Sequence, residues 1–366
     1  MKNTFGNALK VTLFGESHGE TIGAVIDGLT PGIEIDYAFI DSQLNRRRSK
    51  ATVCTQRKEK DEYRIISGIL NGRTTGTPLC IVITNMDTKS EDYSLFDKVA
   101  RPGHADYTAY CKYHGYQDHR GGGHFSGRVT VALVAAGALI QSALQKKGIL
   151  IGTHIEKCAG IADRSFENYA EDIKYIHSIP FSILDTEAEK QMMDKMIAAK
   201  YANDSVGGVM ETAVIGMPAG VGEPWFDSLE SMISHAMFSI PAIKGVEFGA
   251  GFACADMTGS EMNDEFCVGE DGTIVTRTNN NGGINGGISN GMPIIFRCAI
   301  KPASSIPKLQ NTVNFIDREN TTVEIVGRHD SAIIPRACVV TETVTAIAVA
   351  DALLTRYGTD YLLTNN

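Results

Sequence analysis

Apolar residues alternate with polar ones in many short segments of this chain, and this period places one face of a strand against a core. Glycine, asparagine and aspartate separate these segments. Asn71-Gly72 and Asp271-Gly272 have the composition of tight turns between or beside strands. We predict strands at Lys10–Phe14, Thr21–Asp27, Tyr63–Leu70, Leu79–Thr84, Val206–Gly216, Gly245–Ala255, Gly272–Thr276, Pro293–Ile300 and Thr321–Val326.

Other segments place apolar residues three and four positions apart, which is the spacing of one face of a helix. We predict helices at Asp36–Arg48, Arg128–Lys147, Thr186–Ala202, Phe226–Ser239 and Val340–Tyr357. Predicted strands often follow one another without an intervening helix. This order favours an α+β fold with largely antiparallel sheets over a doubly wound parallel sheet.

No internal repeat or low-complexity linker divides the chain. Its 366 residues can bury a large core, and the strand pattern resumes after a polar, Lys- and Glu-rich stretch at residues 155–204. We therefore expect a single domain over residues 1–366, with residues 155–204 as a peripheral excursion.

The overall charge is negative, because 34 Lys and Arg residues stand against 43 Asp and Glu residues. This balance argues against nonspecific binding to nucleic acid or an anionic membrane, and it gives weight to local arginine clusters. The 8 cysteines show neither CxxC pairs nor zinc-type spacing with histidine, which is typical of buried, reduced thiols. Residues 1–10 lack the apolar core of a signal peptide, and Val129–Ile140 is too short to cross a bilayer. We expect a cytoplasmic protein.

Three segments far apart in the chain each set a histidine among glycine, arginine and acidic residues. They are Gly15-Glu16-Ser17-His18-Gly19, Arg101-Pro102-Gly103-His104-Ala105-Asp106 and Gly327-Arg328-His329-Asp330. Histidine exchanges protons near neutrality, since its unperturbed pKa is about 6.5. Glycine lets backbone approach a ligand, and arginine offers a fork of donors to phosphate or carboxylate. One such segment is equally well a turn whose polar groups satisfy the backbone. Three of them indicate loops that converge on one site for an anion.

Further segments combine glycine with cations or hydroxyls. Gly121-Gly122-Gly123 ends where a long helical pattern begins, and a glycine-rich loop at a helix N-terminus suits phosphate. A flexible loop capped by Ser126 is the alternative. Asn279–Gly291 could wrap a ligand or form a surface loop, and Lys301–Ser305 adds a cation and two hydroxyls beside a predicted strand end. Arg46-Arg47-Arg48 closes a predicted helix, where a solvated basic end is the default interpretation.

Together these motifs resemble the signature regions of the chorismate synthase family. The resemblance rests on Gly15–Gly19 with Ile22–Gly28, on Arg101–Tyr107 with Gly121–Arg128, and on Gly327–Arg336. Connecting segments match as well: Thr55–Glu59, Thr74–Pro78, Gly220–Pro224, Lys244–Glu247 and Asn281–Gly291. The resemblance extends from about Gly6 to Leu354, nearly the whole chain.

The resemblance implies a carbon–oxygen lyase that converts 5-enolpyruvylshikimate 3-phosphate into chorismate and phosphate. The implied reaction is an anti 1,4-elimination, the last common step of the shikimate pathway to aromatic compounds. It requires reduced FMN without net redox change. The chain shows no dinucleotide-binding fingerprint, so we expect an external flavin reductant rather than direct use of NADPH. The resemblance also implies a homotetramer whose subunit is a sandwich of two largely antiparallel sheets with helices outside.

The same resemblance assigns roles to single residues. His18 would protonate the departing phosphate, and His104 would stabilise negative charge at N1 and the C2 carbonyl of the flavin. Asp330 with Ser17 would accept the proton from flavin N5, and His329 would be a positioning residue. The cations for the substrate would be Arg46, Arg47, Arg48, Arg101, Arg128 and Arg336. The flavin contacts would be His124, Phe125, Ser126, Pro241, Ala242, Gly286, Lys301, Pro302, Ala303, Ser304, Ser305 and Arg328.

This sequence departs from the family pattern at several of these positions. At His124-Phe125 the arginine and one serine of the family motif are missing. Ser49-Lys50 replaces a proline-glycine pair, a basic residue is absent around Val53-Cys54, and Ser331 replaces a proline. Lys50 is our candidate to substitute for the lost cation.

Two other functional classes fit parts of the sequence. A metal-dependent phosphohydrolase could use His18, His104, His329 and Asp330 as ligands, although their spacing matches no zinc pattern. Chelators would abolish the activity of such an enzyme, and flavin would not affect it. A flavin carrier would bind FMN without turnover, but FMN has only one phosphate and does not require so many arginines. Our expectation includes no metal.

Overall fold

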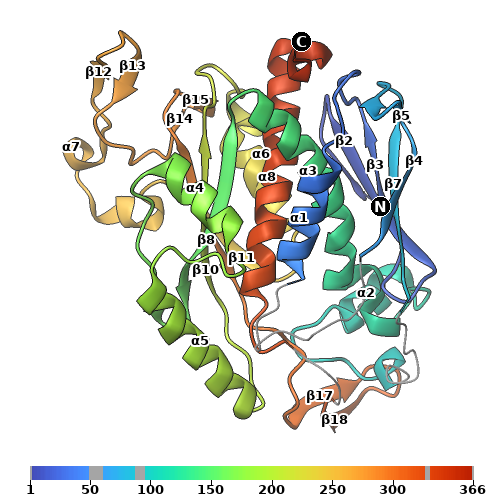
Figure 1. The fold of residues 1–366 in the computed structure, drawn as a ribbon. Helices are drawn as coiled ribbons and strands as arrows, with labels where there is room; N and C mark the ends of the chain where they lie inside the picture. The colour runs from blue at the N-terminus through green and yellow to red at the C-terminus, as the bar shows by residue number, and fades with distance from the viewer. Residues whose placement is uncertain (1, 49–60, 87–94, 326–329, 365–366) are drawn as a thin grey trace.

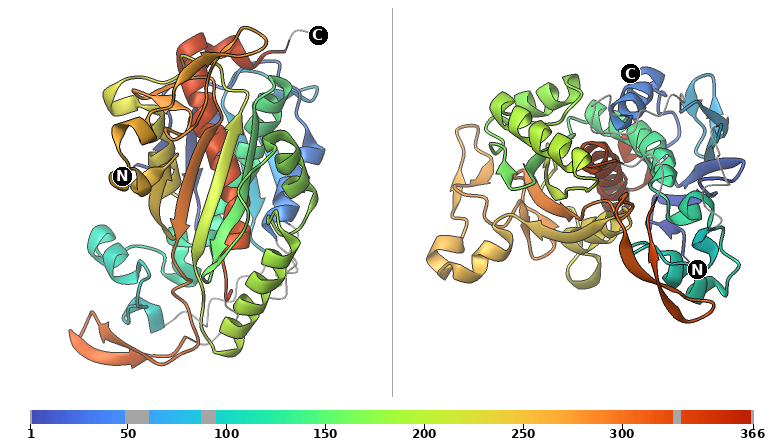
Figure 2. Two further views of the ribbon diagram at one scale, coloured as in Figure 1. Left: turned by 90° about the vertical axis from the view of Figure 1, so that its left-hand side faces the viewer. Right: turned by 90° about the horizontal axis from the view of Figure 1, so that it is seen from below.

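The computed structural model describes residues 2–48, 61–86, 95–325 and 330–364. Two five-stranded antiparallel sheets stand on either side of a layer of helices (Figure 1, Figure 2). The first sheet has the strand order β1-β2-β3-β7-β4, and the second has the order β11-β16-β10-β8-β9.

The first sheet is built mainly from residues near the N-terminus. Its strands are β1 (Thr4–Phe5), β2 (Lys10–Phe14), β3 (Thr21–Asp27), β7 (Leu79–Thr84) and β4 (Tyr63–Ser67). Residues along β7 alternate as the sequence predicted, since Leu79, Ile81 and Ile83 are buried while Cys80 and Val82 are only half-buried. One face of this sheet therefore packs on the interior, and the other faces outward.

The second sheet is covered on both faces. Its strands are β11 (Ile243–Phe248), β16 (Ile294–Ile300), β10 (Gly208–Ile215), β8 (Leu150–Cys158) and β9 (Ile161–Ala162). The long helix α8 (Ile334–Tyr357) packs on β8 and β10 from the inside, and α4 (Tyr169–Ser178) packs on the same strands from the outside (Figure 1). Successive residues of β8 and β10 are consequently buried instead of alternating.

Helices α3 (Thr130–Lys146) and α8 lie between the two sheets, accompanied by α1 (Tyr37–Arg47) and α6 (Leu229–Phe238) (Figure 1). α3 contacts β3 and β7 of the first sheet, whereas α8 contacts the second sheet, and the two helices pack closely on each other. A Cβ atom at Gly137 of α3 would lie 2.3 Å from the carbonyl oxygen of Thr343 in α8. This contact requires a residue without a side chain.

The α+β class with two antiparallel sheets is confirmed, but the expectation that the helices lie outside is wrong for α3 and α8. Both helices are long and apolar enough to cross a membrane by length and composition. However, 94% of the apolar window at Gly127–Lys146 and 100% of that at Ile334–Tyr357 is buried inside the protein. A helix that is apolar all round must be covered all round, and the space between two sheets provides that cover.

Smaller elements complete the fold. They are α2 (Asp106–Tyr113), α5 (Thr186–Tyr201), α7 (Gly259–Met262), the hairpins β5 (Ile69–Leu70)–β6 (Arg73–Thr74), β12 (Phe266–Val268)–β13 (Ile274–Thr276), β14 (Ile284–Asn285)–β15 (Ile288–Ser289) and β17 (Gln310–Asn314)–β18 (Glu319–Val323), and the 3₁₀ helices η2 (Arg120–Phe125), η3 (Gly127–Val129), η4 (Trp225–Asp227), η5 (Gly251–Asp256) and η6 (Thr359–Leu362). The predicted turn at Asn71-Gly72 is confirmed, because both residues have positive φ between β5 and β6.

Some predicted boundaries are wrong. The predicted strand Gly245–Ala255 ends at Phe248, after which the chain turns into η5. The helix predicted at Val340–Tyr357 begins earlier, at Ile334 of α8. Pro335 does not prevent this start, because a proline is tolerated in the first turn of a helix. The elements α2, α4 and β8 were not predicted. Val326, the end of one predicted strand, lies outside the described residues, and the single domain with an excursion at residues 155–204 stays a prediction.

Candidate active site

Several loops meet at one end of the helical layer. Thr21 pairs with Thr84, so the β2–β3 loop and the residue after β7 lie at the same edge of the first sheet. The side-chain amide of Asn85 donates to the carbonyl oxygens of Glu16 (3.0 Å) and Gly19 (2.9 Å) and so fixes that loop. α1 ends at this end of the structure, and α3 and α8 begin there (Figure 1).

The glycine triplet approaches the β2–β3 loop. Gly121, Gly122 and Gly123 all have positive φ, which explains why the loop uses glycine. The Ser17 hydroxyl donates to the carbonyl oxygen of Gly121 (2.9 Å), and the Ser17 amide donates to that of Gly123 (3.1 Å). A Cβ atom at Gly121 would lie 2.0 Å from Nδ1 of His18, so the imidazole occupies the space that a side chain would fill.

The second predicted histidine lies against the next glycine. A Cβ atom at Gly122 would lie 3.3 Å from Nε2 of His104. The structure therefore brings His18 and His104, which are far apart in the sequence, to successive residues of one loop.

A buried carboxylate organises the His104 segment. Oδ1 of Asp106 lies 2.8 Å from Nδ1 of His104 and 2.7 Å from Nη2 of Arg101, while Oδ2 accepts from Nε and from the amide of Arg101, both at 2.9 Å. Burial alone would raise the pKa of Asp106, but the hydrogen bonds from Arg101 and His104 hold it well below its usual range. The Arg101 guanidinium also lies 4.6 Å from the centre of the Phe96 ring.

Three predicted substrate-binding arginines gather around another buried carboxylate, Asp61. Arg128 bonds directly to Asp61, and Arg47 and Arg48 each have a nitrogen 3.8 Å from Oδ2 of Asp61. Arg47 is further held by the carbonyl oxygen of Gly127 (2.9 Å), and Asp61, Arg47 and Arg128 are buried. Among these four side chains positive charge exceeds negative charge, which suits a polyanionic ligand.

Arg46 points elsewhere. Its guanidinium pairs with both carboxylate oxygens of Glu342 in α8, at 2.8 and 3.0 Å, and reaches Ser182 at 3.3 Å. Burial alone would raise the pKa of Glu342, but Arg46 and His177 lower it to about 2. The structure does not bring Arg46 to the arginine cluster, because neighbouring residues of a helix project about 100° apart. Its contacts are those of a buried ion pair that joins α1 to α8.

The third histidine segment is described only in part. Asp330 pairs with Arg336 in the first turn of α8, with Oδ2 3.2 Å from Nε. Arg328 and His329 lie outside the described residues, as do Ser49, Lys50 and the matched segment Thr55–Glu59.

The predicted flavin contacts fall into three groups. His124, Phe125 and Ser126 continue from the glycine triplet. Nδ1 of His124 donates to the carbonyl oxygen of Gly15 (2.8 Å), and Ser126 accepts from the amide of Arg128 (3.3 Å). Phe125 is 36% exposed and stands edge-on to Tyr113.

The second group adjoins the His104 segment. Nζ of Lys301 donates to the carbonyl oxygen of Gly103 and to the Ser304 hydroxyl at 2.5 and 2.8 Å. The Lys301 amide donates to the carbonyl oxygen of Ala242 (3.0 Å), which places Pro241 and Ala242 alongside. Pro302, Ala303 and Ser305 belong to the same segment.

Gly286 forms the third group alone. It lies in the turn of the β14–β15 hairpin. Gly283, which immediately precedes this hairpin, lies against Pro293 just before β16, since a Cβ there would be 2.5 Å from the carbonyl oxygen of Pro293, whereas Lys301 follows the last residue of β16. Strand β16 separates the two ends, so the structure does not bring Gly286 to Lys301 within one chain.

Asp61, Asn85 and Asp106 were missed as site residues. The sequence could have identified Asp106, since it lies two positions after His104 within the same motif. It could not have identified Asp61 and Asn85, because the residues that they contact are distant in sequence. Among the described residues, no group of three or more His, Cys, Asp and Glu side chains is arranged to hold a metal ion.

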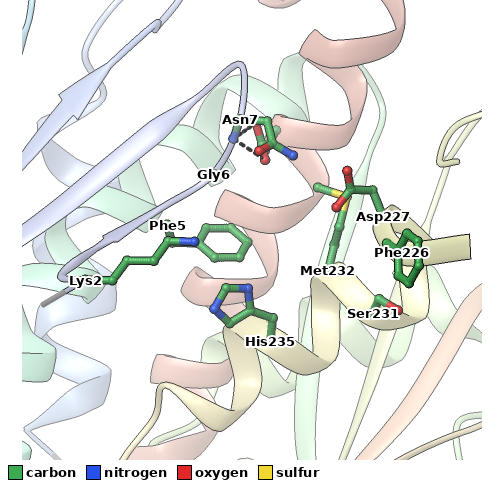
Figure 3. A pocket seen from close by; sticks show the side chains of 10 residues that line it. Lys2, Phe5, Gly6, Asn7, Phe226, Asp227, Ser231, Met232 and His235 are labelled. Carbon is green, nitrogen blue, oxygen red and sulfur yellow. Dashed lines mark hydrogen bonds between the residues drawn. The ribbon is translucent and has the colours of Figure 1, made fainter.

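A separate cavity of about 120 Å³ lies between the N-terminal segment, α6 and α8 (Figure 3). Phe5, Asn7, Met232, His235 and Asp351 contribute to its lining. None of the predicted site residues lines it.

Two imidazoles face successive glycines of one loop, next to buried arginines, and this grouping is our candidate active site for a small anionic substrate. Residues 9–354 match the model of the family described as chorismate synthase. The chain is 45% identical over 353 residues to the chorismate synthase of Methanosarcina mazei, covering 96% of each chain. It is 42% identical to that of Thermococcus kodakarensis over 96% of this chain and 97% of the relative. A crystal structure of a chorismate synthase matches with a TM-score of 0.74 at 28% identity, over 97% of this chain and 94% of that one. The chain belongs to the chorismate synthase family.

Proposed function

We propose that this chain converts 5-enolpyruvylshikimate 3-phosphate into chorismate and phosphate by an anti 1,4-elimination, with reduced FMN required and no net redox change. The observation that carries the proposal is the placement of His18 and His104 on the successive glycines 121 and 122, beside the Asp61 arginine cluster. Family membership supports it.

The arginines suit the charge of this substrate, which carries two carboxylates and a phosphate. Charge-assisted hydrogen bonds contribute roughly 1.5–3 kcal/mol each, so several are needed to hold and orient it. Arg47, Arg48 and Arg128 gather around the single carboxylate of Asp61, and a guanidinium carries five N–H donors. Arg101 and Arg336 are the remaining candidates.

The residues present fit a flavin. The glycine loop places no side chain of its own against the imidazole edges of His18 and His104, and Lys301 and Ser304 add a cation and a hydroxyl beside Gly103. When bound, reduced FMN would supply the transient electron that cleavage of the C–O bond needs and recover it when the C–H bond breaks.

In this proposal His18 donates a proton to the departing phosphate. His104 would stabilise negative charge on a bound flavin through Nε2, the nitrogen that faces Gly122. Asp330, working with Ser17, would accept the proton released from flavin N5, and Arg336 pairs with Asp330. In the same proposal Arg328 is a flavin contact and His329 is a positioning residue.

Assembly and supply of reducing power belong to the same proposal. Trp225, Phe226 and Phe252 are 85%, 94% and 84% exposed, and large exposed aromatic side chains favour association between copies, as in the expected homotetramer. We expect an external flavin reductant rather than direct use of NADPH, and a cytoplasmic location.

The test is anaerobic incubation with 5-enolpyruvylshikimate 3-phosphate, with and without reduced FMN, followed by measurement of the phosphate released. Phosphate release that depends on reduced FMN and survives a chelator supports the proposal. Release without flavin that a chelator abolishes would identify a metal-dependent phosphohydrolase, and FMN binding without release would identify a carrier. For the lost cation, an unchanged substrate KM in Lys50→Ala would count against Lys50.

A further inference from the structure

We propose that Asp106 is the positioning residue of His104. Its carboxylate keeps the neutral imidazole in the tautomer that carries hydrogen on Nδ1, so that Nε2 is the atom available to a ligand. The inference deepens the proposed function and rests on it for the role of His104.

Every acceptor position of Asp106 faces a donor. Oδ2 receives the Nε and amide hydrogens of Arg101, and Oδ1 receives Nη2 of Arg101 and lies 2.8 Å from Nδ1 of His104. Asp106 is buried in the first turn of α2, where the helix N-terminus also favours negative charge. Three hydrogen bonds from Arg101 therefore fix the carboxylate of Asp106 independently of His104.

The hydrogen on Nδ1 follows from these contacts. Nη2 of Arg101 also lies 3.0 Å from Nδ1, and a guanidinium can only donate. If Nδ1 were unprotonated, its lone pair would accept from Arg101 but would face the ionised Oδ1 of Asp106 at the shorter distance. An ionised carboxylate can only accept, so the Nδ1–H tautomer is the arrangement in which the 2.8 Å contact is a hydrogen bond.

The consequence lies on the opposite edge of the ring. Nε2 of His104 faces Gly122, and a Cβ there would lie only 3.3 Å away, so the backbone of the glycine loop comes close to this nitrogen. With Nδ1 occupied, the proton that His104 gains or loses is the one on Nε2. Nε2 therefore donates to negative charge only after it has gained a proton, and Asp106 determines that Nε2 is the nitrogen that gains it.

Asparagine at position 106 should reverse the tautomer. If its amide nitrogen takes the place of Oδ2, it meets two donors of Arg101 that cannot be removed. If it takes the place of Oδ1, it meets one donor of Arg101, and His104 can adapt by moving its hydrogen to Nε2. The second arrangement has fewer conflicts between donors, and it leaves Nδ1 as an acceptor.

A matched control exists on another part of the chain. Asp172 is also buried, pairs with both terminal nitrogens of Arg164 (2.6 and 3.1 Å) and accepts from the amide of Glu167, with no histidine among these partners. Asp172→Asn disturbs the same kind of aspartate–arginine pair away from the site. It should leave the tautomer of His104 and the turnover rate unchanged.

The first experiment is nitrogen NMR of the full chain labelled at histidine, with the His104 signals assigned by His104→Gln. At a pH where the imidazole is neutral, we expect hydrogen on Nδ1 in the wild type and in Asp172→Asn, and on Nε2 in Asp106→Asn. Hydrogen on Nε2 in the wild type would overturn the inference even if Asp106→Asn failed to fold.

The second experiment separates positioning from general support of the fold. Asp106→Asn should lower kcat for phosphate release on the order of 10²-fold with little change in the substrate KM, and it should add no further loss to His104→Ala. Losses that multiply in the double variant would show that Asp106 acts apart from His104 and would overturn the inference. If the tautomers are as expected but Asp106→Asn and His104→Ala both keep full turnover, Asp106 positions His104 and the proposed role of His104 is refuted.

Discussion

Alanine at position 121 would put a methyl group where the His18 imidazole lies. The added Cβ would be 2.0 Å from Nδ1 and Cε1 of His18 and 2.6 Å from the Ser17 hydroxyl oxygen. Because nonbonded heavy atoms rest about 3.5 Å apart, the ring must move by roughly 1.5 Å. A displacement of that size in a catalytic group can cost on the order of 10² in rate, so we expect Gly121→Ala to lower kcat by about that factor or more.

The substitution also lowers stability through the backbone conformation of Gly121, and a control variant measures that effect alone. Gly121 has a φ of +58°, and a left-handed conformation costs a residue with a side chain about 1–2 kcal/mol. Gly148 has a φ of +79°, and a Cβ there would meet nothing within 4 Å. Gly148→Ala therefore carries the backbone cost without displacing a histidine.

Both variants are measured by denaturant unfolding and by anaerobic phosphate release with reduced FMN. We expect both variants to lose stability, Gly121→Ala the more because it also displaces His18, and we expect a loss of turnover only in Gly121→Ala. Turnover in Gly121→Ala equal to that of Gly148→Ala would refute the argument that the glycine loop and His18 form one catalytic unit.

Three further outcomes follow from the structure. His18→Ala and His104→Ala should each lower kcat on the order of 10²–10⁴-fold while the circular dichroism spectrum persists; near-normal turnover in both would remove them from the chemistry. Burial alone would lower the pKa of His154, but hydrogen bonds with Asp163 (2.8 Å) and Glu211 (3.2 Å) raise it above its ordinary value of 6.5. The stability that protonated His154 contributes is therefore fully present below about pH 6.5 and is lost as the pH rises through the raised pKa. The difference in melting temperature between wild type and His154→Gln should consequently shrink at alkaline pH. A difference that does not depend on pH would contradict this role of His154. Asp351 is fully buried and accepts from the amides of Asn7, Ala8 and Leu9, so Asp351→Asn should cost about 3 kcal/mol in urea unfolding, and a cost near zero would count against this role.

The local patterns determined much of this protein. Alternation along β7 and the apolar spacing of α5 predict their elements because each depends only on which face meets a core. The histidine and glycine motifs likewise predict a site for an anion, since residue type and backbone freedom are local properties. The succession of strands was enough for the α+β class.

Only the tertiary structure decided where those elements and motifs meet. An apolar helix must be buried, but nothing in its own residues says that α3 and α8 lie between two sheets. The adjacent arginines 46 and 47 differ only in direction along α1, yet one pairs with Glu342 and the other lies in the Asp61 cluster. Periodicity describes a residue relative to its own element, whereas an ion pair or a shared glycine loop depends on segments that the chain brings together only when it folds.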